Sequence, residues 1–217
     1  MKAPQVGELV ARMTPLEFVS GKLTAAGQAQ GAKTNSILKW TQESQRLGDI
    51  VRGSLLRNTL LQNYALPKKV FEPEFSKYDA GMQYGLHCDA GLFNPFAANA
   101  LRTDLSVTLF LSAASDYDGG ELRLKHNAGE ARIKADIGDA VVYPSTFLHE
   151  VTRITRGCRL VAVTWIESHV RSHEARSVLY ELSCIAADLS EDLHTRSDTK
   201  LQLSRTYNNL VRLFADT

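Results

Sequence analysis

His87, Asp89 and His149 are residues whose types and spacing could together hold a metal ion. Asp89 lies two positions after His87, and His149 follows 60 residues after Asp89. Side chains at positions i and i+2 of a β-strand point to the same face, so His87 and Asp89 can face one interior. Two imidazoles and one carboxylate that leave coordination positions open are the ligand set of non-haem Fe(II) oxygenases. Taken alone, however, the H-x-D spacing favours two ordinary interior histidines and a turn aspartate.

Arg159 supplies a second chemical group, ten residues after His149. Strand parity places it on one face with Val161, Val163 and Trp165, which are otherwise apolar. An arginine buried on such a face is costly without an anion, and its planar fork suits a carboxylate. A solvent-exposed strand end explains Arg159 alone equally well. Together with the histidine–aspartate set, a carboxylate-bearing co-substrate lying between a metal ion and Arg159 is the better explanation.

The elements that must position these residues are predicted to be short antiparallel strands. From about residue 70 to residue 167 the hydrophobic periodicity is two, as in Leu105–Ser112, where apolar and hydroxyl side chains mostly alternate. Asp118-Gly119-Gly120 reads as a turn between two such strands. Short strands joined by frequent turns, without intervening helices, indicate an antiparallel sandwich or barrel.

Helices are predicted on both sides of this β region. Thr14-Pro15-Leu16-Glu17 is typical of a helix start, and a second helix is expected over about 43–62. Two amphipathic stripes, over 178–189 and 203–214, predict two further helices that pack on the outer face of the sheet. We therefore divide the chain into three parts of one domain. These are an N-terminal helical support region (1–65), a β core (66–168) and a C-terminal helical extension packing on the same domain (169–217).

Seven segments, several of them around the candidate residues, form a recognisable set: Phe75–Asp89, Arg102–Ser112, Tyr117–Leu122, Tyr143–His149, Thr155–Gly157, Trp165–Ile166 and Tyr207–Arg212. Together they resemble the PKHD-type hydroxylases, which belong to the prolyl-4-hydroxylase-like, 2-oxoglutarate- and Fe(II)-dependent dioxygenases. The resemblance covers about residues 10–217 and leaves residues 1–13 unlike the usual opening of the family.

The resemblance implies a mainly β fold with flanking helices, namely a double-stranded β-helix (jelly-roll) barrel with N- and C-terminal α-helices. It implies that His87, Asp89 and His149 hold Fe(II), that 2-oxoglutarate chelates the iron, and that Arg159 takes its distal carboxylate. Tyr78 matches a tyrosine that relatives place near the co-substrate, although an aromatic closing the barrel is an equal reading. No catalytic residue beyond the metal ligands is expected.

The implied activity is hydroxylation coupled to decarboxylation of 2-oxoglutarate, with O2 consumed, succinate and CO2 released, and ascorbate (vitamin C) as the reductant. The substrate is expected to be a protein residue such as proline, or a small molecule. Two alternatives stay open. A cupin-like metalloenzyme would keep the metal ligands without using 2-oxoglutarate, and a non-catalytic jelly-roll binding protein would need no metal.

Composition limits the partners and the cellular location that we expect for this protein. The 217 residues carry 25 basic and 24 acidic side chains, a net charge of +1, which argues against a nucleic-acid partner. No apolar run reaches the roughly 18 residues of a membrane span, and the N-terminal residues do not form a secretory signal. Three cysteines without C-x-x-C spacing favour a reducing compartment, so a cytoplasmic protein is expected. The C-terminal helices could also form a homo-oligomer interface.

Overall fold

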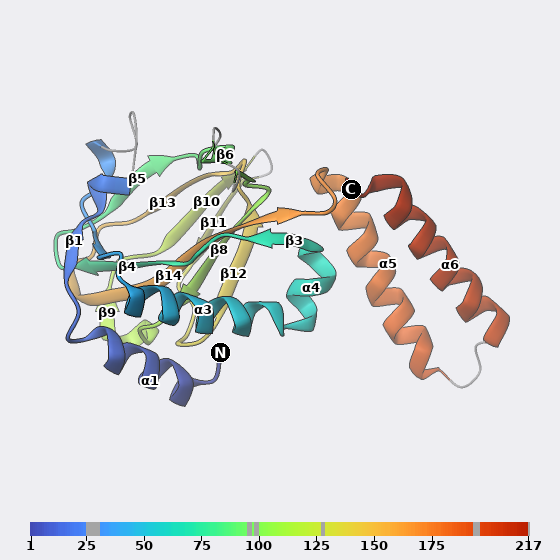
Figure 1. The fold of residues 1–217 in the computed structure, drawn as a ribbon, viewed down its shortest axis with the longest axis horizontal. Coiled ribbons are helices and arrows are strands. Elements are labelled where there is room, and N and C mark those ends of the chain that lie inside the picture. The colour runs from blue at the N-terminus through green and yellow to red at the C-terminus, as the bar shows by residue number, and fades with distance from the viewer. Residues whose placement is uncertain (25–30, 95–96, 98–99, 127–128, 193–195, 217) are drawn as a thin grey trace.

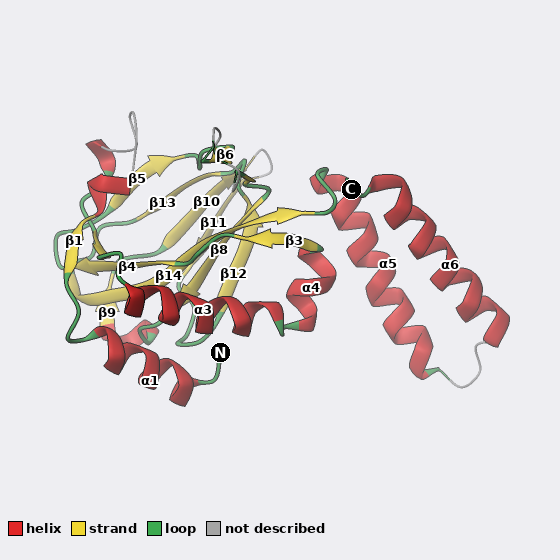
Figure 2. Cartoon of the chain, in the orientation of Figure 1, coloured by secondary structure: helices red, strands yellow, loops and turns green. Residues whose placement is uncertain are grey.

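The body of the protein is built from antiparallel β-sheets (Figures 1 and 2). The computed structural model describes residues 1–24, 31–94, 97, 100–126, 129–192 and 196–216. The larger sheet has the order β1 (Phe18–Ser20), β2 (Ser36–Leu38), β4 (Glu74–Asp79), β14 (Arg156–Ser168), β8 (Leu105–Phe110) and β12 (Ala140–Pro144), with β3 (Pro67–Val70) and β9 (Tyr117–Asp118) also paired to β14. The smaller sheet has the order β11 (Gly129–Ile133), β10 (Leu122–His126), β13 (Leu148–Val151) and β5 (Tyr84–His87), and β6 (Leu92–Phe93) pairs with β7 (Leu101–Arg102). This mainly β architecture with flanking helices confirms the predicted jelly-roll class.

Strand β8 shows how the sequence builds this arrangement. Leu105 and Leu109 belong to a core cluster that includes Val6 and Leu47 from the N-terminal helices. Ser106 and Thr108, on the alternate positions, line an internal cavity. All six residues of the strand are buried, so β8 is covered on both faces rather than on one. The alternation of leucine and valine with hydroxyl residues therefore separates a hydrocarbon core from a polar interior.

The N-terminal helix α1 (Ala3–Met13) lies where the sequence predicted no element, and the predicted helix start at Thr14 is wrong. Thr14 instead ends α1, with its backbone N–H and its hydroxyl both donating to the carbonyl of Val10. Pro15 has no N–H and cannot continue the helix. The same threonine–proline pair that can open a helix here closes one.

The predicted helix over 43–62 is two helices, α3 (Gln42–Leu56) and α4 (Thr59–Ala65). Thr41 caps α3, and its hydroxyl oxygen accepts from the backbone N–H of Ser44 at 3.1 Å. Asn58 interrupts the run because its side-chain oxygen accepts from the N–H of Leu61 at 2.9 Å and so starts a new helix. Short 3-10 turns lie at Gly21–Thr24 and Ala114–Asp116.

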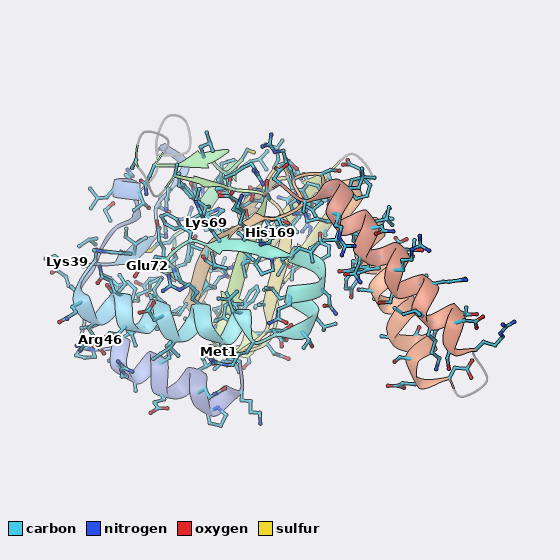
Figure 3. All side chains as sticks on the ribbon, turned by 45° about the vertical axis from the view of Figure 1, so that its right-hand side comes forward. Met1, Lys39, Arg46, Lys69, Glu72 and His169 are labelled. Atoms are coloured by element: carbon cyan, nitrogen blue, oxygen red, sulfur yellow. The ribbon has the colours of Figure 1, made fainter. Side chains whose placement is uncertain are left out.

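The two C-terminal helices, α5 (His173–Glu191) and α6 (Ser197–Phe214), form a hairpin beside α4. The expectation that both cover the outer face of a sheet is wrong. Figures 1 and 3 show the hairpin extending beyond the end of the sheets. Its packing centres on Leu179, which is fully buried against Val170 and the partly buried Leu66, and on the edge-to-face contact of Tyr64 with Tyr180. Among the described residues, no helix is long and apolar enough to cross a bilayer.

Candidate active site

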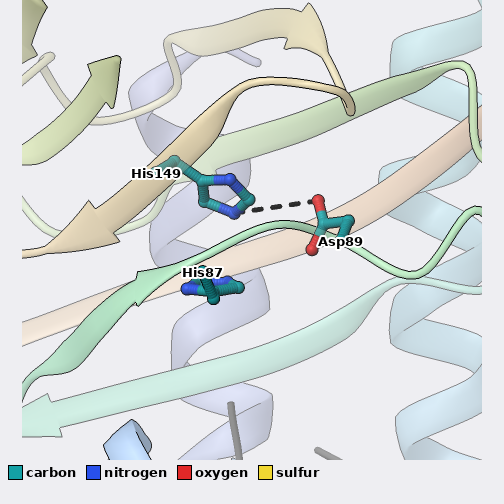
Figure 4. A group of neighbouring side chains, drawn as sticks. All are labelled: His87, Asp89 and His149. Carbon is teal, nitrogen blue, oxygen red and sulfur yellow. Dashed lines mark ion pairs between the residues drawn. The ribbon is translucent and has the colours of Figure 1, made fainter. Parts of the chain in front are cut away.

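The three predicted metal-site residues come together on the smaller sheet (Figure 4). His87 ends β5 and lies directly opposite His149 of β13 in the antiparallel register, and Asp89 follows β5 by two residues. One potential ligand atom from each residue lies within 4.8 Å of the others. His149 Nε2 is 3.7 Å from Asp89 Oδ2. Residues 60 positions apart in the sequence therefore present three donor atoms to one point.

In both imidazole rings Nδ1 faces a backbone carbonyl. His87 Nδ1 lies 2.8 Å from the carbonyl of Gly85, and His149 Nδ1 lies 3.1 Å from the carbonyl of Phe147. Nδ1–H donation to these carbonyls leaves Nε2 as the available ligand atom. Burial, and then the nearby His149, lower the pKa of His87 to about 4. The neutral ring is the form that binds metal.

Neighbouring side chains hold the three residues in place. Ser106 Oγ donates to Asp89 Oδ2 at 2.6 Å and lies 2.7 Å from Ser145 Oγ. Tyr84 stacks on His87 with ring centroids 3.6 Å apart, and the edge of Tyr143 meets His149 at 5.2 Å. None of these supports was predicted from the sequence. Tyr84 and Ser145 lie three and four residues before a triad histidine, but nothing in their spacing marks them as supports.

The same site opens on an internal cavity of about 320 Å³, which also reaches Arg159 and Tyr78. The metal-site triad belongs to the smaller sheet or directly follows it, whereas Arg159 on β14 and Tyr78 on β4 face each other in the register of the larger sheet. The cavity therefore lies between the two sheets and is lined by both.

Arg159 is 1 % exposed and sits among aromatic rings. Its guanidinium carbon lies 5.2 Å from the Tyr78 ring centroid and 5.3 Å from that of Phe110. Within the described part of the chain, its Nε and Nη1 atoms have no hydrogen-bond partner. A buried guanidinium with unused donors is suited to a carboxylate ligand. Burial raises the pKa of Tyr78 to about 12, so its hydroxyl stays protonated at neutral pH.

Tyr117 completes the surroundings of Arg159 and was not predicted. It is fully buried, and its hydroxyl has no hydrogen-bond partner among the described residues. Gly120 allows this packing, since it has φ +65° and an added Cβ would lie 3.0 Å from Tyr117 Cε2 and 3.1 Å from Arg159 Cδ. The sequence predicts only a turn at Asp118-Gly119-Gly120. The turn in fact brings a tyrosine against the arginine.

Comparison with known proteins identifies the class of this fold and site. Residues 73–167 match the family model of the 2OG-Fe(II) oxygenase superfamily. The crystal structure of a Pseudomonas putida prolyl-4-hydroxylase shares the fold, with a TM-score of 0.57 and 23 % identity over 77 % of this chain and 88 % of that one.

Relatives that align over most of their own length define the family more closely. A PKHD-type hydroxylase of Paraburkholderia phytofirmans is 38 % identical, covering 92 % of this chain and 88 % of the relative. A second, from Gluconobacter oxydans, is 39 % identical over 94 % and 91 %. The chain therefore belongs to the PKHD-type hydroxylases of the 2OG-Fe(II) oxygenase superfamily. The predicted family and enzyme class are confirmed, and both alternatives, the cupin-like metalloenzyme and the non-catalytic binding protein, are disfavoured.

Proposed function

We propose that His87, Asp89 and His149 bind Fe(II) and that 2-oxoglutarate lies between this iron and Arg159 while a substrate C–H bond is hydroxylated. The two histidines fit the ion because each keeps Nε2 free, and Asp89 adds the single carboxylate of the set. When bound, Fe(II) would supply the chemistry that activates O2 for the coupled decarboxylation.

The observation that carries this proposal is the buried Arg159 guanidinium on the wall of the cavity that holds the three candidate ligands. Its unused donors need an anion, and the distal carboxylate of 2-oxoglutarate is the anion that the family uses. Tyr78, on the paired strand, lines the same end of the cavity and would orient that carboxylate. A cavity without such an arginine would suit a metalloenzyme that does not use a keto acid.

The protein's own residues would bind, orient and exclude water. Ser106 fixes the Asp89 carboxylate, and the carbonyls of Gly85 and Phe147 fix the two rings. The packing of Arg159 among Tyr78 and aromatic neighbours keeps bulk water from the co-substrate end of the cavity. These groups are held before any ligand arrives, which lowers the cost of organising the site.

The test is an anaerobic titration of the Fe(II)-loaded protein with 2-oxoglutarate, followed by its visible metal-to-ligand charge-transfer band. Appearance of the band with saturating behaviour supports the proposal. Iron binding without any band on adding 2-oxoglutarate would contradict it. Succinate release across peptide and small-molecule pools then distinguishes a protein residue, such as proline, from a small molecule as the substrate.

We also propose the remaining features that the family resemblance implies. Ascorbate would act as the reductant that returns iron to Fe(II), and the protein would work in the cytoplasm. The 66–168 region would form the oxygenase core, with 1–65 as helical support and 169–217 as a helical extension of the same domain. A homo-oligomer through the C-terminal helices is compatible with this arrangement, and sedimentation analysis would test it.

A further inference from the structure

The part of the cavity away from Arg159 carries two charged side chains that the proposed reaction does not use, Lys33 and Glu74. On β14, Arg159 pairs with Tyr78, whereas Val163 pairs with Glu74. Glu74 therefore lies four residues along β4 from Tyr78, roughly 13 Å in an extended strand. Lys33 bridges to β5 just before the metal-site histidine of that strand. The pair thus lies in the part of the cavity remote from Arg159.

Lys33 is buried, and its ammonium makes only one hydrogen bond within the described ranges. Its side chain belongs to a residue that is 6 % exposed. Among the described residues, its Nζ makes one hydrogen bond, to Thr24 Oγ1 at 2.9 Å, and no ion pair with a carboxylate. Its other close neighbour is the ring of Tyr84, whose centroid lies 5.1 Å away. An ammonium has three N–H donors, and burying it without an anion is costly.

Glu74 acts on Lys33 from a distance. Burial lowers the pKa of Lys33, while the negative charges of Glu74 and Asp89 raise it. Burial in turn raises the pKa of Glu74. The carboxylate therefore favours the charged form of the lysine without occupying its donors. This arrangement leaves the ammonium ready for an anion that enters the cavity.

Two aromatic side chains form an apolar surface in the same part of the cavity. Phe93 and Trp165 both line it, with ring centroids 4.5 Å apart in an edge-to-face contact. Trp165 Nε1 is buried and has no hydrogen-bond partner within the described ranges. The wall thus offers aromatic surface together with a second unused N–H donor. A ligand that fits must combine an apolar portion with hydrogen-bond acceptors.

We infer that the primary substrate carries an anionic group, in the simplest case a carboxylate, which pairs with Lys33 while an apolar portion packs on Phe93 and Trp165. This inference rests on the proposed function, because the same cavity must bring the hydroxylated carbon close to the metal-site triad. A substrate without such a group would leave the ammonium with one hydrogen bond, and the indole N–H with none, among the described residues.

The test compares matched acids and amides bound to the holoprotein with Zn(II) in place of iron and saturating 2-oxoglutarate. The probes are N-acetyl-leucine, N-acetyl-phenylalanine and N-acetyl-proline, each as the free acid and as the carboxamide, titrated by calorimetry. We expect at least one acid to bind wild type about 10- to 100-fold more tightly than its amide, the range for a hydrogen bond to a charged group. Lys33→Met should remove this preference and Lys33→Arg should keep it. Lys77→Met, whose side chain pairs with Asp79 outside the cavity, should leave it unchanged.

Amides that bind as well as acids, a preference that survives Lys33→Met, or no binding of any probe at millimolar concentration would each overturn the inference. So would a Lys33→Met protein that loses affinity for 2-oxoglutarate itself, because Lys33 would then belong to the co-substrate site. Titration of wild type with 2-oxoglutarate alone separates these results from failure of the proposed function, which would show no 2-oxoglutarate binding at all.

Discussion

At the scale of single residues, the metal-site triad makes the most direct prediction. Replacing His87, Asp89 or His149 by alanine should strongly reduce iron content and abolish succinate release while the circular dichroism spectrum stays that of wild type. Three protein ligands are a small set, so the loss of one removes both affinity and geometry. Asp89→Ala should be the most tolerant, because water or an added anion can partly replace a carboxylate.

Iron content measured after purification and dialysis checks this expectation, with His169→Ala as the control because His169 is exposed and lies outside the triad. A variant that keeps both full iron content and full coupled turnover would remove that residue from the proposed ligand set.

Arg159 separates co-substrate binding from iron binding. Arg159→Leu would leave the distal carboxylate of 2-oxoglutarate buried without its partner, which should weaken affinity by about 30- to 5,000-fold. Iron content should be unchanged, and Arg159→Lys should be intermediate because an ammonium keeps the charge and loses the planar fork. Anaerobic titration of the charge-transfer band gives the affinities.

Arg156→Leu is the matched control, since Arg156 lies on the same strand, is exposed and pairs with Asp118 at 2.6 Å. Equal 2-oxoglutarate affinity in wild type and Arg159→Leu would contradict the assignment of Arg159 and with it most of the case for a bound keto acid.

Tyr117 is expected to position Arg159 rather than to touch substrate, because it packs beside the guanidinium and does not line the cavity. Tyr117→Ala removes the ring that packs beside Arg159 and should raise the KM for 2-oxoglutarate about two- to tenfold without changing kcat. Tyr117→Phe keeps the ring and loses a hydroxyl that has no hydrogen-bond partner among the described residues, so its KM should stay close to that of wild type. Tyr207→Ala, on α6, serves as the control. A fall in kcat at saturating 2-oxoglutarate would instead give Tyr117 a direct part in the reaction.

At the scale of secondary-structure elements, the strands were easier to predict than the helix ends. The alternation in Leu105–Ser112 reports directly on a strand whose two faces meet different surroundings, so the sequence carries that information locally. Helix ends depend on competition between caps. Thr14 and Asn58 each suit more than one position, and the tertiary structure decides between them.

Some residues of the candidate site could also be predicted from the sequence, and others could not. His87, Asp89, His149 and Arg159 were predicted to share one site because their combined spacing resembles that of the family, and the structure brings all four to one cavity. Lys33 could not, since it precedes a short strand, and only the closure of the cavity buries it. Spacing along one chain cannot show which charged side chains a fold will bury together.

A substitution in the core of the α5–α6 hairpin should lower the stability of the protein and leave ligand binding unchanged. Leu179 is fully buried beside Val170 and Leu66, so Leu179→Ala should lower the free energy of unfolding by about 2–5 kcal/mol. Affinity for iron and 2-oxoglutarate should be unaffected at temperatures where the variant is folded. Thermal unfolding measures the first effect and the anaerobic titration the second.

Leu201→Ala, at a position of α6 that is 71 % exposed, should change stability by less than about 0.5 kcal/mol. Loss of 2-oxoglutarate affinity in the folded Leu179→Ala protein would show that the hairpin reaches the active site.

At the scale of the whole molecule, the cavity lies between two sheets, and these sheets pack against different parts of the protein. The larger sheet packs against α1 and α3 through a hydrocarbon core in which Leu47 and Leu105 are fully buried. The smaller sheet contributes the histidines of the triad from neighbouring strands. The two halves of the proposed site are therefore supported by different parts of the fold.

Iron would be held mainly from the smaller sheet, by His87 and His149 on adjacent strands. Asp89, which follows β5, accepts a hydrogen bond from Ser106 of β8 and so connects this site to the larger sheet. The keto acid would bridge the two sheets. One end would lie at the metal-site triad beside β13 of the smaller sheet, and the other would pair with Arg159 on β14 of the larger sheet. Bound in this way, it would link the two sheets across the cavity, and the distance between the triad and Arg159 would limit the length of the keto acid that fits.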